Sequence, residues 1–228
     1  HSLDRRQRQM CIRDRRGMNR FAHVGMTTRV IGGHWVWSPR MQQMARDNEI
    51  EAYVLPGGVI MQLMREVAAG RPGLITHVGL GTFVDPRLDG GRMNEAAKQN
   101  LTEIITIDGR DYLRYLPVPV TVALLRGSYA DEDGNISLEE EPANLDIYAI
   151  AAAAHNSGGK VIFQVRGKVP RHSMKAREVR IPSALVDAVV VDETQRQGYD
   201  LVYDAALSGQ YRRDELASPQ PEFSSRLV

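Results

Sequence analysis

One glycine-rich stretch, HVGLGTFVDPRLDGGRMN at residues 77–94, constrains most strongly what this chain can fold into. It follows an apolar run at 74–78, which predicts a buried strand. Gly79 and Gly81 would end that strand, because glycine permits a positive φ and a close approach of backbone to ligand. Asp85-Pro86 requires an extended or turn conformation. The stretch predicts a long loop at a strand's carboxyl end, which either binds a small ligand or only connects two elements.

Strand and helix signals alternate before this loop. Ser38 is a plausible N-cap, and Pro39 suits the first turn of a helix that runs to Asn48. Apolar residues at helical spacing predict a second helix over 59–69, which Gly70 ends. Short strands are predicted at 29–33, 52–55 and 74–78. Such alternation with short links predicts an α/β layer with a largely parallel sheet.

The pattern changes after Asn94. Two β-rich runs, 103–107 and 111–116, flank Asp108-Gly109, which is a strong hairpin signal. The nearly continuous apolar run 120–125 predicts a strand buried on both faces. Further strands are predicted at 136–138, 160–165 and 185–191, with a helix over 145–155. The fold class is therefore α/β: an open, mostly parallel sheet with flanking helices and an added antiparallel hairpin region.

Bulk composition excludes several function classes. The 228 residues are long enough for one large domain, and the net charge of +1 predicts neither nucleic-acid nor membrane binding. Cys11 is the single cysteine, so a disulfide framework is excluded and a cytoplasmic location is expected. The histidines are scattered, and the acidic turn at 131–135 lacks the register of an EF-hand, so no metal site is predicted. Nucleophile-elbow and phosphate-loop motifs are also missing from the sequence.

The two ends of the chain differ in character from the rest. Residues 1–16 are rich in arginine, which is typical of a nucleic-acid arm, but they resemble translated sequencing adapter more closely. We therefore expect 1–16 to be a non-native leader, outside the fold. The domain is predicted to span 17–209 and to be truncated at its start. Polar, proline and serine residues predict an interdomain linker or tail at 210–228.

Several segments together resemble the N-terminal half of family I coenzyme A transferases, most closely the fused acetate/propionate or 3-oxoacid type. The glycine-rich stretch carries the strongest likeness. Other segments agree in unbroken order from 17 to 209, namely 19–23, 29–35, 69–73, 130–136, 156–159 and 203–209. The resemblance implies the coenzyme A transferase fold, shared with sugar-phosphate isomerases, with its opening strand and helix missing here.

The resemblance also implies a mechanism. In the family, a glutamate attacks an acyl-CoA thioester and becomes a glutamyl-CoA thioester, from which a second acid takes the CoA in a ping-pong reaction. Acetate, propionate or a 3-oxoacid is the expected acceptor. The nucleophilic glutamate lies in the family's second half, so no catalytic residue is expected in this chain, and the chain alone is expected to be inactive. Coenzyme A is a substrate, and no cofactor is implied.

What this half is expected to supply is the wall of the acyl and oxyanion pocket. The implied residues are Pro56, Gly57, Gly58, Gly79, Gly81, Thr82, Phe83, Asp85 and Asn94. Gly57 stands where the family has glutamine, so a backbone amide replaces a side-chain donor. The expected partners are acyl-CoA, carboxylic acids, a C-terminal transferase domain and a second copy of the protein. The alternatives are a separate α subunit that binds a β subunit, or a non-catalytic domain that binds a sugar phosphate or effector.

Overall fold

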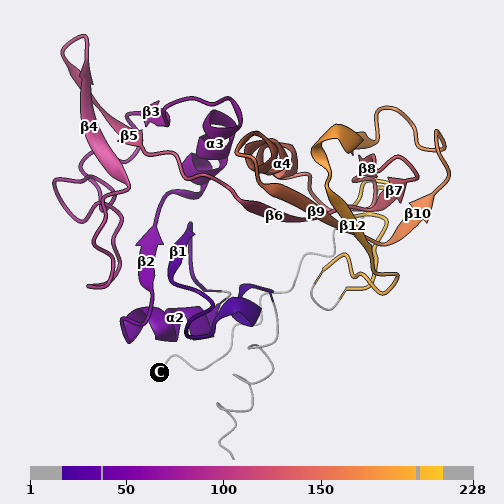
Figure 1. Cartoon of the computed structure of the whole chain (residues 1–228), viewed down its shortest axis with the longest axis horizontal. Coiled ribbons are helices and arrows are strands. Elements are labelled where there is room, and N and C mark those ends of the chain that lie inside the picture. The colour runs from indigo at the N-terminus through magenta and orange to yellow at the C-terminus, as the bar shows by residue number, and fades with distance from the viewer. Residues whose placement is uncertain (1–16, 37, 199–200, 213–228) are drawn as a thin grey trace, which may run out of the picture. The chain divides into compact units, whose positions relative to one another are not determined.

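A computed structural model describes residues 17–36, 38–198 and 201–212 (Figure 1). The predicted leader at 1–16 and most of the predicted tail lie outside these residues. The chain divides into two compact units. Unit 1 comprises the residues up to Ala123 together with Ala149–Lys160, and unit 2 comprises Leu124–Tyr148 and the residues from Val161 onward.

Unit 1 begins with a strand–helix–strand arrangement. Its elements are the 3-10 turn η1 (Gly17–Phe21), β1 (Arg29–Gly32), α2 (Pro39–Arg46), β2 (Glu51–Val54) and α3 (Gly57–Ala68). β1 and β2 pair in parallel from Arg29↔Glu51 to Gly32↔Val54, as the alternating pattern predicts. α2 begins at a proline and buries Met41, Met44 and Ala45 on one face. The predicted helix over 38–48 is confirmed, with its end two residues earlier.

Helix α3 starts at Gly57, two residues before the predicted start. Pro56 provides the N-cap with φ −55°, and its carbonyl accepts the N–H groups of Val59 at 2.9 Å and Ile60 at 3.1 Å. Gly70 follows the helix with φ +65°, which is the expected stop. The two glycines at the start of the helix therefore belong to its first turn.

The strand before the glycine-rich stretch differs from its prediction. β3 (Leu74–Thr76) is three residues long and pairs antiparallel with β5 (Arg110–Tyr115). It belongs to the sheet β3-β5-β4, with β4 at Thr102–Ile107, and not to the parallel pair. The hairpin prediction is confirmed, because Asp108 and Gly109 both have positive φ. In the hairpin, β4 pairs with one edge of β5, and β3 pairs with the other edge.

The remaining elements lie mainly in unit 2. They are β6 (Val122–Arg126), β7 (Tyr129–Asp131), β8 (Ile136–Ser137), α4 (Ile147–Asn156), β9 (Lys160–Val165), β10 (Gly167–Val169), β11 (Val179–Ile181), η2 (Ser183–Leu185) and β12 (Ala188–Val191). The strands among them form two sheets, with the orders β12-β9-β6 and β10-β7-β8-β11. β9 and β12 pair in parallel, which confirms the parallel character expected there.

Strand β6 corrects the prediction of a strand buried on both faces. Val122 and Leu124 are 52% and 61% exposed, while Ala123 between them is buried. β6 is the edge strand of its sheet, so only one of its faces packs on a core. β12 also begins later than predicted, because 183–185 form the turn η2. The acidic turn is confirmed as a turn: Asp131 Oδ1 accepts the N–H groups of Asp133 and Asn135.

Candidate functional site

The far end of the glycine-rich stretch attaches to the second edge of β2. The N–H of Val54 donates to Gly91 O at 2.8 Å, and the N–H of Met93 donates to Ala52 O at 2.9 Å. Between them, Tyr53 forms an antiparallel bridge with Arg92. This pairing brings the loop 77–94 beside the carboxyl end of β2, where the Pro56 turn begins.

The loop also shares a hydrophobic core with helix α3. Val84 of the loop is fully buried and packs in one cluster with Leu55, Val59 and Leu63. Leu80, which is partly buried, packs against the same cluster. The start of α3 and the loop are therefore held together by apolar contacts as well as by backbone pairing.

Asp85 is a buried brace inside the loop. Its carboxylate accepts the N–H of Gly81 at 2.8 Å and the Arg87 guanidinium at 2.7 and 2.9 Å. The hydrogen bonds from the Arg87 side chain, with that from the Gly81 N–H, hold the pKa of the Asp85 carboxyl well below its usual range. The charged carboxylate thus fixes the turn that presents Gly81, and its own oxygens are engaged within the loop.

Asn94 ends the loop, and its side-chain amide makes four hydrogen bonds. Its Nδ2 donates to the carbonyls of Ala45 and Ile50, both at 2.8 Å. Its Oδ1 accepts the N–H groups of Ala52 and Ala97, both at 3.2 Å. Asn94 therefore connects α2, β2 and the loop, and this bracing requires both a donor and an acceptor on one side chain.

Gly79 is required by packing within the protein. Its φ is +100°, and a Cβ there would lie 2.5 Å from both Tyr115 Oη and Val84 Cγ2. The Tyr115 hydroxyl donates to Val78 O at 2.9 Å, and burial raises the pKa of Tyr115 to about 12. We expected the space beside Gly79 to admit a ligand, whereas Tyr115 and Val84 occupy it.

Four other predicted site residues face open space. A Cβ added at Gly57 or Gly58 would meet no atom within 4 Å, and the same holds at Gly81, whose φ is +71°. Phe83 is 47% exposed. Because the first N–H groups of a helix have no partners within it, Gly57 and Gly58 offer donors at the positive end of α3. Such an end binds carboxylates and oxyanions.

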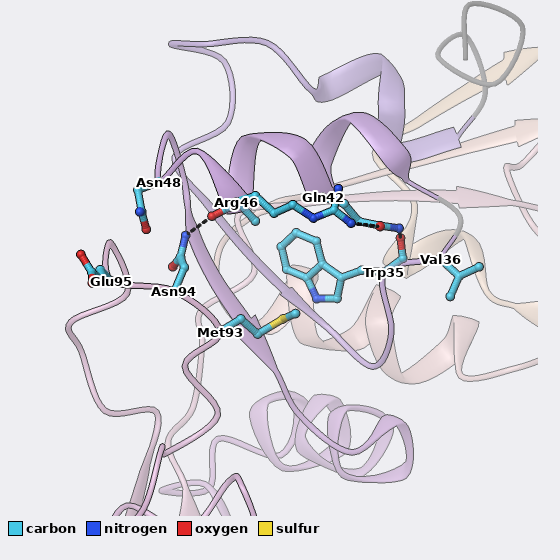
Figure 2. A pocket seen from close by; sticks show the side chains of 9 residues that line it. Trp35, Val36, Gln42, Arg46, Asn48, Met93, Asn94 and Glu95 are labelled. Carbon is cyan, nitrogen blue, oxygen red and sulfur yellow. Dashed lines mark hydrogen bonds between the residues drawn. The ribbon is translucent and has the colours of Figure 1, made fainter. Parts of the chain in front are cut away.

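Two cavities, each of about 410 Å³, lie at the far end of the loop, around Asn94. The first is lined by Trp35, Val36, Gln42, Ala45, Arg46, Asn48, Met93, Asn94 and Glu95 (Figure 2). The second is lined by Asp89, Arg92, Asn94, Glu95, Ala97 and Lys98. Asn94 is the predicted site residue that lines both. Trp35 was not among the predicted site residues, although it belongs to the segment 29–35 that carried part of the family resemblance.

Comparison with known proteins decides the family. The sequence model described as "Coenzyme A transferase" matches residues 9–192. The chain belongs to the coenzyme A transferase family. The match begins inside the predicted leader 1–16, whose non-native origin stays a prediction.

Individual relatives of this coenzyme A transferase chain agree. It is 43% identical to caffeate CoA-transferase of Acetobacterium woodii over 216 residues, which cover 93% of this chain and 41% of that protein. The crystal structure of the acyl-CoA transferase YdiF from Escherichia coli O157:H7, in a thioester complex with CoA, superposes with a TM-score of 0.85 at 39% identity. That match covers 88% of this chain and 41% of YdiF, so the fold expected from the resemblance is confirmed.

A third relative is a separate subunit. The α subunit of the acetoacetyl-CoA:acetate/butyrate CoA transferase of Clostridium acetobutylicum is 25% identical over 174 residues, which cover 76% of this chain and 71% of that subunit. This chain spans about two fifths of the length of the first two relatives.

Two further properties concern the described residues only. They contain no group of three or more histidine, cysteine, aspartate or glutamate side chains placed to hold a metal ion. Within the same residues, no helix has the length and apolar character needed to cross a membrane.

Proposed function

We propose that this chain is the acid-binding half of an enzyme that moves CoA from an acyl-CoA to a short-chain carboxylic acid such as acetate, propionate or a 3-oxoacid. Family membership supports the reaction class. The observation that carries the site is the open N-terminus of α3 at Gly57 and Gly58, with the loop 77–94 held beside it. Pro56, Gly81, Thr82 and Phe83 complete the proposed wall, while Asp85, Asn94 and Gly79 hold it in shape.

The proposed chemistry needs a carboxylate from outside this chain. A glutamate oxygen bonds to the thioester carbonyl carbon, and the CoA thiolate leaves. The thiolate then attacks the glutamyl carbonyl, which releases the first acid and leaves a glutamyl-CoA thioester. A second acid reverses these steps. Each tetrahedral intermediate carries a negative oxygen, and one well-placed N–H donor contributes roughly 3–4 kcal/mol to its stabilisation.

The missing half can be supplied in two ways. YdiF and the A. woodii relative are much longer than the matched region, which supports a fused second domain. The C. acetobutylicum relative is an α subunit of nearly this length, which supports a separate β subunit as the alternative. In both arrangements coenzyme A is a substrate and the enzyme needs no cofactor. Assembly of two or more copies is part of the proposal.

The test is CoA exchange between acetyl-CoA and isotopically labelled acetate. The chain joined to its second domain, or mixed with a β subunit, should transfer label with ping-pong kinetics. The purified chain alone should transfer none, because it lacks the nucleophile. Robust turnover by the chain alone would contradict the assignment of the nucleophile. Failure of the complete protein with every short acid tried would contradict the proposed function itself.

A further inference from the structure

The start of α3 is bordered by three exposed glycines. Gly57 and Gly58 begin the helix, and Gly33 directly follows strand β1. None of the three has a positive φ, so the backbone conformation does not require glycine at any of them. Gly57 and Gly58 also weaken the helix, since glycine is a poor helix former. The reason for glycine at these positions therefore lies in what surrounds them.

Gly33 lies directly against Gly57. A Cβ added at Gly33 would lie 3.2 Å from Gly57 Cα and 3.5 Å from Gly57 N. Cβ atoms in proteins rarely make so close a contact, and the atoms met here belong to the backbone, which cannot rotate aside as a side chain can. At Gly32, a Cβ would make only ordinary contacts, 3.5 Å from His34 O and 3.7 Å from Trp35 Nε1. Two neighbouring glycines thus differ in what a methyl group would disturb.

The two backbones are held together on both sides of this contact. The last residues of β1 and β2 pair with each other, and the N–H of Leu55 donates to Gly32 O at 3.1 Å. Leu55 is buried and packs in one core cluster with Val59 of α3. Because these contacts fix the chain before and after Gly57, a methyl group at Gly33 would displace the Gly57 peptide by a few tenths of an ångström.

We propose that Gly33 is a positioning residue for CoA transfer, because its lack of a side chain fixes where the Gly57 N–H lies. The inference rests on the proposed function, which assigns that N–H to the oxygen of the reacting acyl group. Such a donor stabilises the charged oxygen of the tetrahedral intermediate far more than the neutral thioester carbonyl. Displacement of the Gly57 peptide should therefore lower kcat and leave the KM for acetyl-CoA nearly unchanged.

Alanine substitutions at the two neighbouring glycines provide a matched pair. In acetyl-CoA:acetate exchange by the complete enzyme, Gly33→Ala should lower kcat about tenfold, because a misplacement of about 1 Å costs about 10²-fold and this one is smaller. The KM for acetyl-CoA should change by less than about twofold. Gly32→Ala should keep both constants within about twofold of the parent values, since its methyl group meets only ordinary contacts. Equal kcat values for the two variants, or a loss that appears in KM alone, would overturn the inference.

A double-mutant cycle separates positioning from a general loss of structure. Gly57→Pro removes the N–H that Gly33 is proposed to position but keeps the contact between the two backbones. On this background, Gly33→Ala should lower kcat by less than about twofold, against about tenfold on the parent background. The same factor on both backgrounds would indicate a structural defect and overturn the inference. A Gly33→Ala enzyme that does not unfold cooperatively in urea would overturn it as well, because the expected displacement is small.

The outcomes also distinguish this inference from the proposed function. If Gly57→Pro lowers kcat and Gly33→Ala does not, the inference fails and the proposed function stands. If Gly57→Pro exchanges label at the parent rate, the donor site at the start of α3 fails together with the role of Gly33, while CoA transfer stands. If the complete parent enzyme exchanges no label with any short acid, the proposed function itself fails.

Discussion

Alanine substitutions at Gly79 and Gly81 should differ in cost although both glycines have positive φ. At Gly81 the space is open, so Gly81→Ala should cost only the backbone penalty, about 1–2 kcal/mol of unfolding free energy. At Gly79 the new Cβ would meet Tyr115 Oη and Val84 Cγ2 at 2.5 Å. Overpacking adds about 1–3 kcal/mol to the backbone penalty, so Gly79→Ala should cost about 2–5 kcal/mol in total.

Urea unfolding followed by circular dichroism measures both variants under one set of conditions. The difference in free energy between them should be at least about 1 kcal/mol, with Gly79→Ala the less stable. Equal costs would refute the reasoning that protein packing, and not ligand approach, requires the first glycine. A larger cost at Gly81 would show that the space beside it is filled in the folded protein.

Three further substitutions test the braces and the charges. Asn94→Asp keeps the acceptor but places a carboxylate against the carbonyl oxygens of Ala45 and Ile50. It should lower the free energy of unfolding, measured by heat or urea, by about 2–4 kcal/mol. A loss below about 0.5 kcal/mol would contradict the role of the four hydrogen bonds of Asn94. Asp85→Asn should speed hydrogen exchange at the Gly81 N–H, and unchanged exchange would contradict its role. Burial, reinforced by the hydrogen-bonded Glu178 carboxyl, raises the pKa of Glu139 from 4.5 to about 7. The folded state therefore binds the extra proton between these values, and stability should fall as pH rises from about 4.5 to about 7. Glu139→Gln should reduce this loss of stability with pH, whereas Glu132→Gln, at an exposed glutamate, should leave the loss unchanged. A loss of stability that persists in Glu139→Gln would show that other groups cause it.

Local signals in the sequence predicted those elements whose cause is local. Pro39 sets the start of α2, and Asp108-Gly109 sets the hairpin. The stretch 160–165 is β9, with the predicted bounds. Each of these depends on residues within a few positions of one another, so the pattern contained the required information.

The predictions that failed concern strands and side chains whose contacts are distant in sequence. Nothing near Leu74 shows that it pairs with Tyr115, 41 positions later, and nothing near Val122 shows that β6 is an edge strand. Strands β7, β10 and β11 have three residues each, too few to show a period. The role of Gly79 depends on Tyr115, which the sequence places 36 positions away.

The resemblance named the residues of the candidate site, but it did not show what each of them contacts. The resemblance identified the loop and the Pro56 turn, and the structure holds them together through Val54, Gly91 and Val84. It did not distinguish side chains that brace the loop, such as Asp85, from positions that face open space, such as Gly57. That distinction needs hydrogen-bond partners and burial, which sequence patterns do not contain. The contact between Gly33 and Gly57 is likewise visible only in three dimensions.

The central claim is that the first backbone N–H groups of α3 stabilise the reacting acyl group. Gly57→Pro removes one such N–H at a position where proline suits a helix start, and Pro56 already has the extended backbone that precedes a proline. Gly57→Ala keeps the N–H, and its Cβ has open space. In acetyl-CoA:acetate exchange by the complete enzyme, Gly57→Pro should lower kcat by roughly 10²–10³-fold while Gly57→Ala stays near the parent value. Equal kcat values for the proline and alanine variants would contradict the account.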